Sequence, residues 1–189
     1  MNPLIKQFKK YGHLAPEIEH DLNSKIKCTT KQRGDFFLKK GQVVSSLFLI
    51  DKGLVRSFFI KDHKEINLWF GFEYEFLGSI TPLFTDKASF ENIEFIEDSL
   101  IYYIFSSDLN NLYLKHLPLN AIGRKMAEEY CSVLEERIIT LQTESAEQRY
   151  NSLLRKHPDA TQRISLGHIA SYLGITQETL SRIRRKQRF

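Results

Sequence analysis

Residues 26–105 alternate short runs of aromatic and β-branched side chains with turn signals, and this alternation most narrows the folds open to the chain. Two of the runs, at residues 47–50 and 54–60, are separated by a turn that contains Gly53. A tight hairpin there needs a residue with positive φ, which glycine adopts readily. The region shows no helical periodicity. The pattern is typical of an antiparallel β-barrel or sandwich.

The rest of the chain is helical in character. Residues 1–25 carry two short apolar repeats at helical spacing, and residues 106–114 predict another short helix. A longer helix is expected to have Pro118 in its first turn and to reach about Gln148. At about 1.5 Å per residue, its roughly 30 residues would span about 45 Å.

One apolar stripe runs along this long helix. It consists of Ile122, Met126, Tyr130, Val133, Leu134, Ile138 and Leu141. The stripe is compatible with a helix that lies on the β-domain and with a helix that pairs with its twin in a homodimer. We favour the homodimer, because the helix is longer than one face of a small barrel requires.

The composition excludes several classes of protein. With 189 residues, 42% hydrophobic and 26% charged, the chain is typical of a globular protein of one or two domains. No run approaches the roughly 18 apolar residues of a membrane span, and residues 1–10 do not resemble a secretory signal. Cys28 and Cys131 are too few for a disulfide scaffold. These features predict no membrane partner and a reducing, cytoplasmic location.

The charge of the chain is unevenly distributed. Residues 149–189 hold nine basic residues against Asp159 and Glu178, a net of +7, whereas the remaining residues hold 18 basic and 21 acidic ones, a net of −3. A near-neutral body with a cationic C-terminal segment is the pattern of a polyanion-binding protein. A solubilising tail is the competing interpretation.

Residues 164–185 contain the most specific local pattern of the chain. Ser165 is suited to cap a helix of about two turns, and Gly174 stands where a left-handed residue ends a helix. Thr176 is suited to cap a second helix. The expected buried side chains are Leu166, Ile169, Ala170, Leu173, Leu180 and Ile183. The pattern predicts a helix-turn-helix, with an ordinary helical hairpin as the competing interpretation.

The outward positions of this segment carry groups that suit nucleic acid. The candidate DNA-binding residues are Ser165, Thr176, Gln177, Glu178, Thr179, Ser181, Arg182 and Arg185. Arg182 is the best candidate for a guanine contact, and Gln177 for adenine. Glu178 would accept from a cytosine amino group or support Arg182. Thr176 and Thr179 would contact phosphates, which positions a protein on DNA without specifying sequence.

Residues 169–182, which read IASYLGITQETLSR, resemble the DNA-binding motif of the Crp/Fnr family of bacterial transcription regulators. Residues 145–150 are similar to the family's hinge. The resemblance covers nearly the whole chain. It implies an α+β fold: a cyclic-nucleotide-binding-like antiparallel β-roll (a double-stranded β-helix or jelly roll) over residues 1–116, a dimerisation helix and hinge over residues 117–148, and a helix-turn-helix domain over residues 149–189.

The resemblance also implies a function. Crp/Fnr regulators are homodimers that bind near-palindromic double-stranded DNA, with recognition helices about 34 Å apart. In the family, the residues that match Gln177, Glu178 and Arg182 read bases. RNA polymerase and a small-molecule effector of unknown identity are the further partners implied. No catalytic residue and no cofactor are expected.

The effector site departs from the family pattern. Members that bind cyclic AMP use a Gly-Glu pair to hold the ribose and an Arg-Ser or Arg-Thr pair to grip the cyclic phosphate. Here Ser79 follows Gly78, the region lacks arginine, and Lys87 is a point charge beside acidic Asp86 and Glu91. Tight binding of cyclic AMP is therefore not expected. The candidate effector pocket is Phe76, Gly78, Ser79, Lys87 and Ser89.

The C-terminus is a second departure. The family usually adds a β-hairpin wing after the recognition helix, but this sequence ends at Phe189. We expect a helix-turn-helix without a complete wing, or a basic tail at residues 184–188 that contacts phosphates instead.

Two cysteines do not suffice for an iron–sulfur cluster, and the six scattered histidines include no close pair, so no metal site is expected.

Two other functions compete with a DNA-binding regulator. An enzyme of the cupin type needs clustered histidine and carboxylate ligands on neighbouring strands, whereas residues 26–105 contain one histidine, His63. The sequence also lacks a Gly-x-Ser-x-Gly motif and a glycine-rich phosphate loop. The other alternative is a small-molecule-binding module in which DNA binding is weak or lost.

Overall fold

The structure is a computed structural model that describes residues 2–85 and 87–186. The chain divides into two compact units. The first unit comprises Met1–Ser57 and Phe70–Glu129, and the second comprises Phe58–Trp69 and Tyr130–Phe189. The expectations for Asp86, Gln187 and Arg188 lie outside the described residues.

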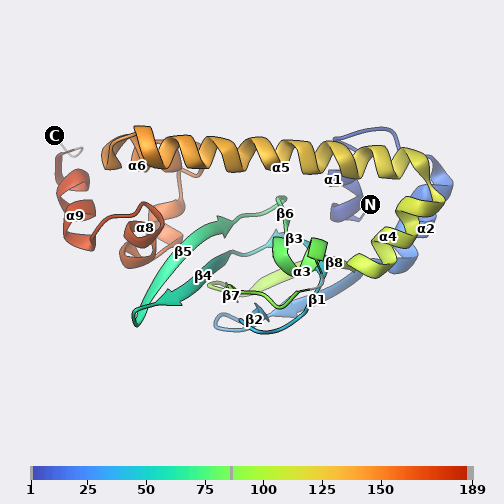
Figure 1. Cartoon of the computed structure of the whole chain (residues 1–189), viewed down its shortest axis with the longest axis horizontal. Helices are drawn as coiled ribbons and strands as arrows, with labels where there is room; N and C mark the ends of the chain where they lie inside the picture. Colours follow the sequence, from blue (N-terminus) through green and yellow to red (C-terminus); the bar gives the residue numbers. More distant parts are fainter. Residues whose placement is uncertain (1, 86, 187–189) are drawn as a thin grey trace. The chain divides into compact units, whose positions relative to one another are not determined.

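An antiparallel β-roll forms the middle of the sequence (Figure 1). Its strands are β1 (Lys27–Lys31), β2 (Phe36–Leu38), β3 (Ser46–Lys52), β4 (Val55–Lys61), β5 (Lys64–Gly71), β6 (Phe76–Leu77), β7 (Asn92–Phe95) and β8 (Ser99–Phe105). They form two four-stranded sheets with the orders β1-β8-β3-β6 and β2-β7-β4-β5. The β-rich prediction for residues 26–105 is confirmed, except that a short helix, α3 (Ile80–Thr85), lies between β6 and β7.

The hairpin between β3 and β4 shows why glycine stands at position 53. Gly53 has φ of +111°, in the left-handed region. A Cβ at this position would lie 2.1 Å from Ser99 Oγ at the start of β8. Gly53 is therefore required both by the backbone conformation of the turn and by the close approach of a neighbouring strand.

Helices cover one side of the β-roll in the first unit. They are α1 (Pro3–Phe8), α2 (Pro16–Lys25), α4 (Ser106–Lys115) and the first part of α5 (Leu117–Thr143). The shared core contains Leu4, Phe8, Leu22, Leu49, Leu112 and Ile122, all buried. The predictions of two short N-terminal helices and of a helix after residue 105 are confirmed.

The long helix is shorter than the expected helix. α5 has Pro118 in its first turn, as predicted, but ends at Thr143 rather than near Gln148. Ser145 instead caps a new helix, α6 (Ala146–Lys156): its hydroxyl accepts from the Gln148 N–H, and the Gln148 side chain accepts from the Ser145 N–H. This reciprocal capping box favours a helix start at the position where a single helix would have continued.

Three further helices complete the second unit: α7 (Ala160–Arg163), α8 (Leu166–Tyr172) and α9 (Gln177–Lys186). Five of the six side chains predicted to be buried there are buried, whereas Leu166 is half-buried. Tyr150 and Leu153 of α6 are buried as well. In the described part of the chain, no helix combines the length and the apolar character needed to cross a membrane.

Candidate nucleic-acid interface

α8 and α9 begin and end where the sequence predicts. The Ser165 hydroxyl accepts from the His168 N–H at 3.2 Å and so caps α8. Gly174 has φ of +70° and follows Leu173, the C-cap of α8. The Thr176 hydroxyl then accepts from the Thr179 N–H at 3.2 Å at the start of α9. These local interactions hold the two helices at a sharp turn over residues 173–176.

Glu178 lies in the first turn of α9, where the helix dipole favours negative charge. Hydrogen bonds from its own backbone N–H and from the Thr176 hydroxyl lower the pKa of the Glu178 carboxyl, and the positive charge of Arg182 lowers it further. Glu178 is therefore an ionised acceptor on the surface of α9 at neutral pH.

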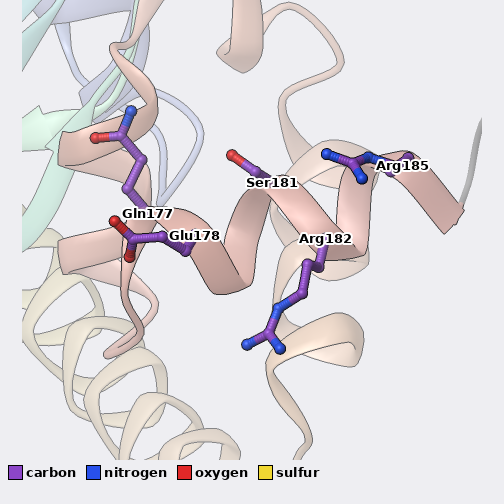
Figure 2. A pocket seen from close by; sticks show the side chains of 5 residues that line it. All are labelled: Gln177, Glu178, Ser181, Arg182 and Arg185. Atoms are coloured by element: carbon purple, nitrogen blue, oxygen red, sulfur yellow. The ribbon is translucent and has the colours of Figure 1, made fainter.

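One face of α9 presents a mixed set of polar side chains to solvent. Figure 2 shows these five residues, which border an open hollow of about 480 Å³: Gln177, Glu178, Ser181, Arg182 and Arg185. Arg182 is exposed, and its Nη2 donates to Thr179 Oγ1 at 3.2 Å. The opposite face of the helix holds the buried Leu180 and Ile183. The structure thus brings five of the eight candidate DNA-binding residues to one surface.

The other three candidates lie at helix starts. Ser165 and Thr176 are exposed caps of α8 and α9, and Thr179 is half-buried, with its hydroxyl 3.2 Å from that of Thr176. Each of these hydroxyl groups already serves the backbone or a neighbouring side chain, so each could contact a phosphate only as an additional partner.

Arg149 belongs to a different class from the exposed arginines. The sequence analysis counts it with the cationic segment, but its Nε and Nη2 donate to Leu173 O at 3.2 and 2.9 Å, and its Nη1 donates to Glu144 O. A cation at the C-terminus of α8 satisfies a free carbonyl and complements the helix dipole. The guanidinium therefore stabilises the domain rather than adding to the exposed charge.

A second arginine caps the same end of α8. Arg137 of α5 donates to Tyr172 O, and its guanidinium carbon lies 3.9 Å from the centroid of the Tyr172 ring. Burial lowers the pKa of Arg137. The sequence analysis missed this contact, because Arg137 and Tyr172 are 35 residues apart and no local pattern links them.

The second unit also includes the hairpin at residues 58–69. The Ser171 hydroxyl of α8 accepts from the Asn67 N–H at 3.0 Å and donates to Glu65 O at 2.9 Å. His168 Nε2 lies 4.0 Å from the Glu65 carboxylate. The hydroxyl joins α8 to the backbone of β5. No signal in the sequence around Ser171 predicted this connection.

The candidate effector residues separate into buried and exposed groups. Ser79 and Ser89 are buried with their hydroxyl oxygens 3.2 Å apart, whereas Lys87 is exposed. A Cβ at Gly78 would lie 3.1 Å from Ser46 O. Phe76 packs on Phe8 and Tyr11 with ring centroids 5.0 and 6.1 Å apart.

Glu91 stands between the buried serines. The sequence analysis treats it as an acidic neighbour of Lys87, but the structure buries its side chain, which accepts hydrogen bonds from the hydroxyls of Ser57 and Ser79. The inward placement of Glu91 follows from the β-strand alternation that also buries Ile93 and Phe95.

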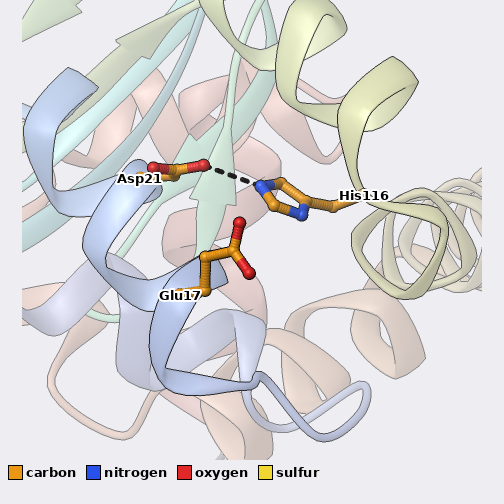
Figure 3. A group of neighbouring side chains, drawn as sticks. All are labelled: Glu17, Asp21 and His116. Carbon is orange, nitrogen blue, oxygen red and sulfur yellow. Dashed lines mark hydrogen bonds and ion pairs between the residues drawn. The ribbon is translucent and has the colours of Figure 1, made fainter.

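One cluster of possible metal ligands lies in the first unit. Glu17, Asp21 and His116 place ligand atoms within 4.8 Å of one another (Figure 3). The sequence did not indicate this group, because His116 lies 95 residues from Asp21; the expectation of no metal site stays a prediction. Lys115 Nζ, however, lies 2.7 Å from Asp21 and 3.9 Å from Glu17, and His116 Nε2 lies 2.7 Å from Asp21.

Lys115 and His116 already bind the Asp21 carboxylate in this cluster. Hydrogen bonds from Lys115 and His116 lower the pKa of Asp21 from 3.8 to about 2, and the Asp21 hydrogen bond raises the pKa of Lys115. Because an ammonium group holds the position between the carboxylates, we interpret the cluster as an ion-pair network that ties α2 to the junction of α4 and α5.

The β-roll, the long helix and the two short helices joined by a turn were compared with known proteins. Residues 29–116 match the family model of the cyclic nucleotide-binding domain. No curated protein sequence matches the chain significantly.

Solved structures of similar fold include three bacterial proteins. FixK2 from Bradyrhizobium japonicum has a TM-score of 0.70 at 17% identity, over 85% of this chain and 83% of that one. A putative Crp/Fnr-family regulator from Eubacterium rectale has a TM-score of 0.72 at 16% identity, over 96% and 87%. Catabolite activator protein from Thermus thermophilus has a TM-score of 0.59 at 23% identity, over 98% and 86%.

Residues 29–116 therefore match a cyclic nucleotide-binding domain, and the fold of the chain, a β-roll followed by helices, is similar to that of a putative Crp/Fnr-family regulator. The α+β fold and the resemblance to this family are confirmed at the level of the fold. The Thermus thermophilus protein is a catabolite activator, and the Eubacterium rectale protein is a putative transcriptional regulator.

Proposed function

We propose that the chain is a sequence-specific, DNA-binding transcription regulator of the Crp/Fnr type, which acts as a homodimer and does not respond to cyclic AMP. The observation that carries this proposal is the two-sided character of α9. Leu180 and Ile183 anchor one face in the domain, and Gln177, Arg182 and Arg185 extend from the other. A helix of this kind suits the major groove, because amide and guanidinium groups form paired hydrogen bonds with base edges.

The charge on α9 supports the same role. Its last turn contains Arg184, Arg185 and Lys186, and its first turn contains one acid, Glu178. Basic side chains at the end of a recognition helix would lie near the DNA backbone, where they displace condensed counterions. Base contacts would then come from the first turns of the helix and phosphate contacts from its end.

The proposed dimer rests on the second half of α5. Side chains there are large, apolar and at least 36% exposed: Tyr130, Val133, Leu134, Ile138, Ile139 and Leu141. Their spacing suits pairing with a second helix. The predicted stripe divides, however, since Ile122 is buried in the core of its own subunit and Met126 packs against that core. Dimer contacts would therefore begin near Tyr130.

The effector proposal follows from the residues of the β-roll. The serine that stands in place of the family glutamate is buried and already bonded, and Lys87 is exposed. A lone exposed ammonium is a weak partner for a cyclic phosphate compared with a buried guanidinium. Isothermal titration of the full chain with cyclic AMP should give no heat of binding at micromolar concentrations.

Selection of bound sequences from a random pool of duplex DNA tests the main proposal. We expect an enriched motif with two-fold symmetry and half-sites about one helical turn apart. An asymmetric motif would contradict the homodimer. A pool without enrichment would contradict DNA recognition and would favour the small-molecule-binding module.

The dimer is tested separately from DNA binding. Ile138→Glu places a charge at the centre of the proposed helix pair and should convert the protein to a monomer in sedimentation experiments. Glu135→Gln, an exposed change on the same helix, is the matched control and should leave the dimer intact. A wild-type monomer at all accessible concentrations would refute this part of the proposal.

A further inference from the structure

A buried carboxylate lies inside the β-roll among hydroxyl groups. Glu91 is 4% exposed, and the serines around it, Ser57, Ser79 and Ser89, are between 0 and 3% exposed. Ser57 belongs to β4, Ser79 follows β6, and Ser89 precedes β7. Three segments that are distant in the sequence thus contribute one hydroxyl each to the same site.

All three hydroxyl groups are used by Glu91. Ser57 donates to one carboxylate oxygen, and Ser79 donates to the other at 2.6 Å. Ser89 donates to the Glu91 carbonyl oxygen at 2.9 Å and accepts from the Glu91 N–H at 3.1 Å. Since a serine has one hydroxyl hydrogen, this arrangement leaves no hydroxyl donor for a bound ligand.

The chemistry of the site is that of an anion receptor. A buried carboxylate loses its hydration and needs donors in return, and hydrogen bonds to a charged acceptor are stronger than those between neutral groups. The neighbouring guanidinium of Arg56 forms an ion pair with a different acid, Glu94, at 2.6 Å. In the described residues, the hydrogen bonds to the Glu91 carboxylate thus come from hydroxyl groups.

The site lies where members of the resembled family bind their effector. Ser79 and Ser89 stand in the segments that the family resemblance aligns with the ribose and phosphate contacts, and both fall within the matched cyclic nucleotide-binding domain. We propose that Glu91 is an internal anion, which fills the hydroxyl site of the β-roll from within the chain and replaces an anionic effector. This inference rests on the proposed absence of a cyclic AMP response and adds its structural cause.

A consequence is that removal of the side chain should create a site for a small carboxylate. Glu91→Ala removes the carboxylate and leaves the hydroxyls of Ser57 and Ser79 facing a space the size of a carboxylate group, while Ser89 keeps its bonds to the backbone of residue 91. Sodium formate is the probe, with sodium chloride of equal ionic strength as the reference. In about 100 mM formate, a site of about 10 mM affinity would raise the melting temperature of full-length Glu91→Ala by about 3–6 °C over chloride.

Three proteins serve as controls. The wild type and Glu91→Gln both retain a side chain in the site, so formate should shift their melting temperatures no more than chloride does. Ile93→Ala opens a cavity at a buried apolar position of β7, and it should also show no formate effect, because an apolar cavity does not hold an anion.

The result that would overturn the proposal is an equal formate shift in the wild type and in Glu91→Ala, or no shift in either. If Glu91→Ala does not fold, formate is added during refolding. Folded protein recovered in formate and not in chloride would support the proposal, and no recovery in either salt would contradict it. These measurements involve no DNA, so they can be interpreted even if the protein does not bind DNA.

Discussion

The β-roll and α9 use polar side chains in opposite ways. In the β-roll, the hydroxyls of Ser57, Ser79 and Ser89 point inward and are satisfied by Glu91. On α9, Gln177 and Arg182 point outward, and the hydrogen-bonding groups that they present are accessible from solvent. Polar groups that have found partners inside the chain stabilise a fold, whereas accessible groups on a rigid helix can bind another molecule.

The two regions therefore differ in what they offer to a ligand. The β-roll matches the model of the cyclic nucleotide-binding domain, yet the three hydroxyls around Glu91 are satisfied without a ligand. α9 is a short helix of ten residues, yet its exposed side chains present hydrogen-bonding groups that are accessible to a binding partner. The accessible side chains of α9 are therefore a better guide to function than the fold of the β-roll.

The largest expected effect is that of salt on DNA binding. If a dimer neutralises about six phosphates, raising sodium chloride from about 50 to 200 mM should lower the affinity by about 10³-fold. The free energy of unfolding should change far less, because the buried Glu91 cluster is poorly screened. Fluorescence anisotropy of labelled duplex DNA and urea unfolding would provide the comparison. A salt-independent affinity would contradict a phosphate-binding role for α9.

The next effect concerns sequence recognition. Arg182→Ala should weaken binding to the selected site by about 1–3 kcal/mol and reduce discrimination against random DNA. Stability should hardly change, since Arg182 is exposed. Arg124→Ala, which removes an exposed arginine paired with Glu128 on α5, is the matched control. Equal losses of affinity on specific and random DNA would show that Arg182 contacts only the backbone.

The reverse outcome is expected for Ser57→Ala. This variant removes one donor from the buried Glu91 carboxylate and should lower the free energy of unfolding by about 1–3 kcal/mol, with DNA affinity unchanged. Ser46→Ala is the control, because the Ser46 hydroxyl is buried without a hydrogen-bond partner. Urea unfolding at neutral pH would measure both variants. Equal losses of unfolding free energy for the two substitutions would contradict a stabilising role of the Ser57–Glu91 hydrogen bond.

The smallest effect concerns the exposed ion pairs of the first unit. The folded pKa of Asp21 is about 2, below its ordinary 3.8, so its stabilising contribution is present above about pH 4 and is lost as the pH falls toward 2. Asp21→Asn should therefore flatten the pH dependence of unfolding between pH 4 and 2. Urea midpoints measured across this range would test the expectation, and parallel curves for both proteins would contradict it.

Local patterns in the sequence account for much of the second unit. Ser165, Gly174 and Thr176 act within one turn of their own positions, so their roles as caps and turn could be predicted from residue type and spacing. The end of α5 was misplaced for a related reason. No proline or glycine interrupts residues 124–148, so the sequence favoured one continuous helix, whereas the capping box of Ser145 and Gln148 decides where the helix stops.

The sequence by itself determined most of the strands and helices, though not α3 or the break between α5 and α6, and it determined which face of α9 is polar. These features depend on neighbours a few residues apart. Only the tertiary structure decided that Glu91 is buried among three serines, that Arg149 caps α8 and that His116 meets Asp21. The contacts of Glu91 with Ser79, of Arg149 with Leu173 and of His116 with Asp21 join residues 12 to 95 positions apart. A side chain that packs against a distant segment leaves no periodic pattern in its own segment.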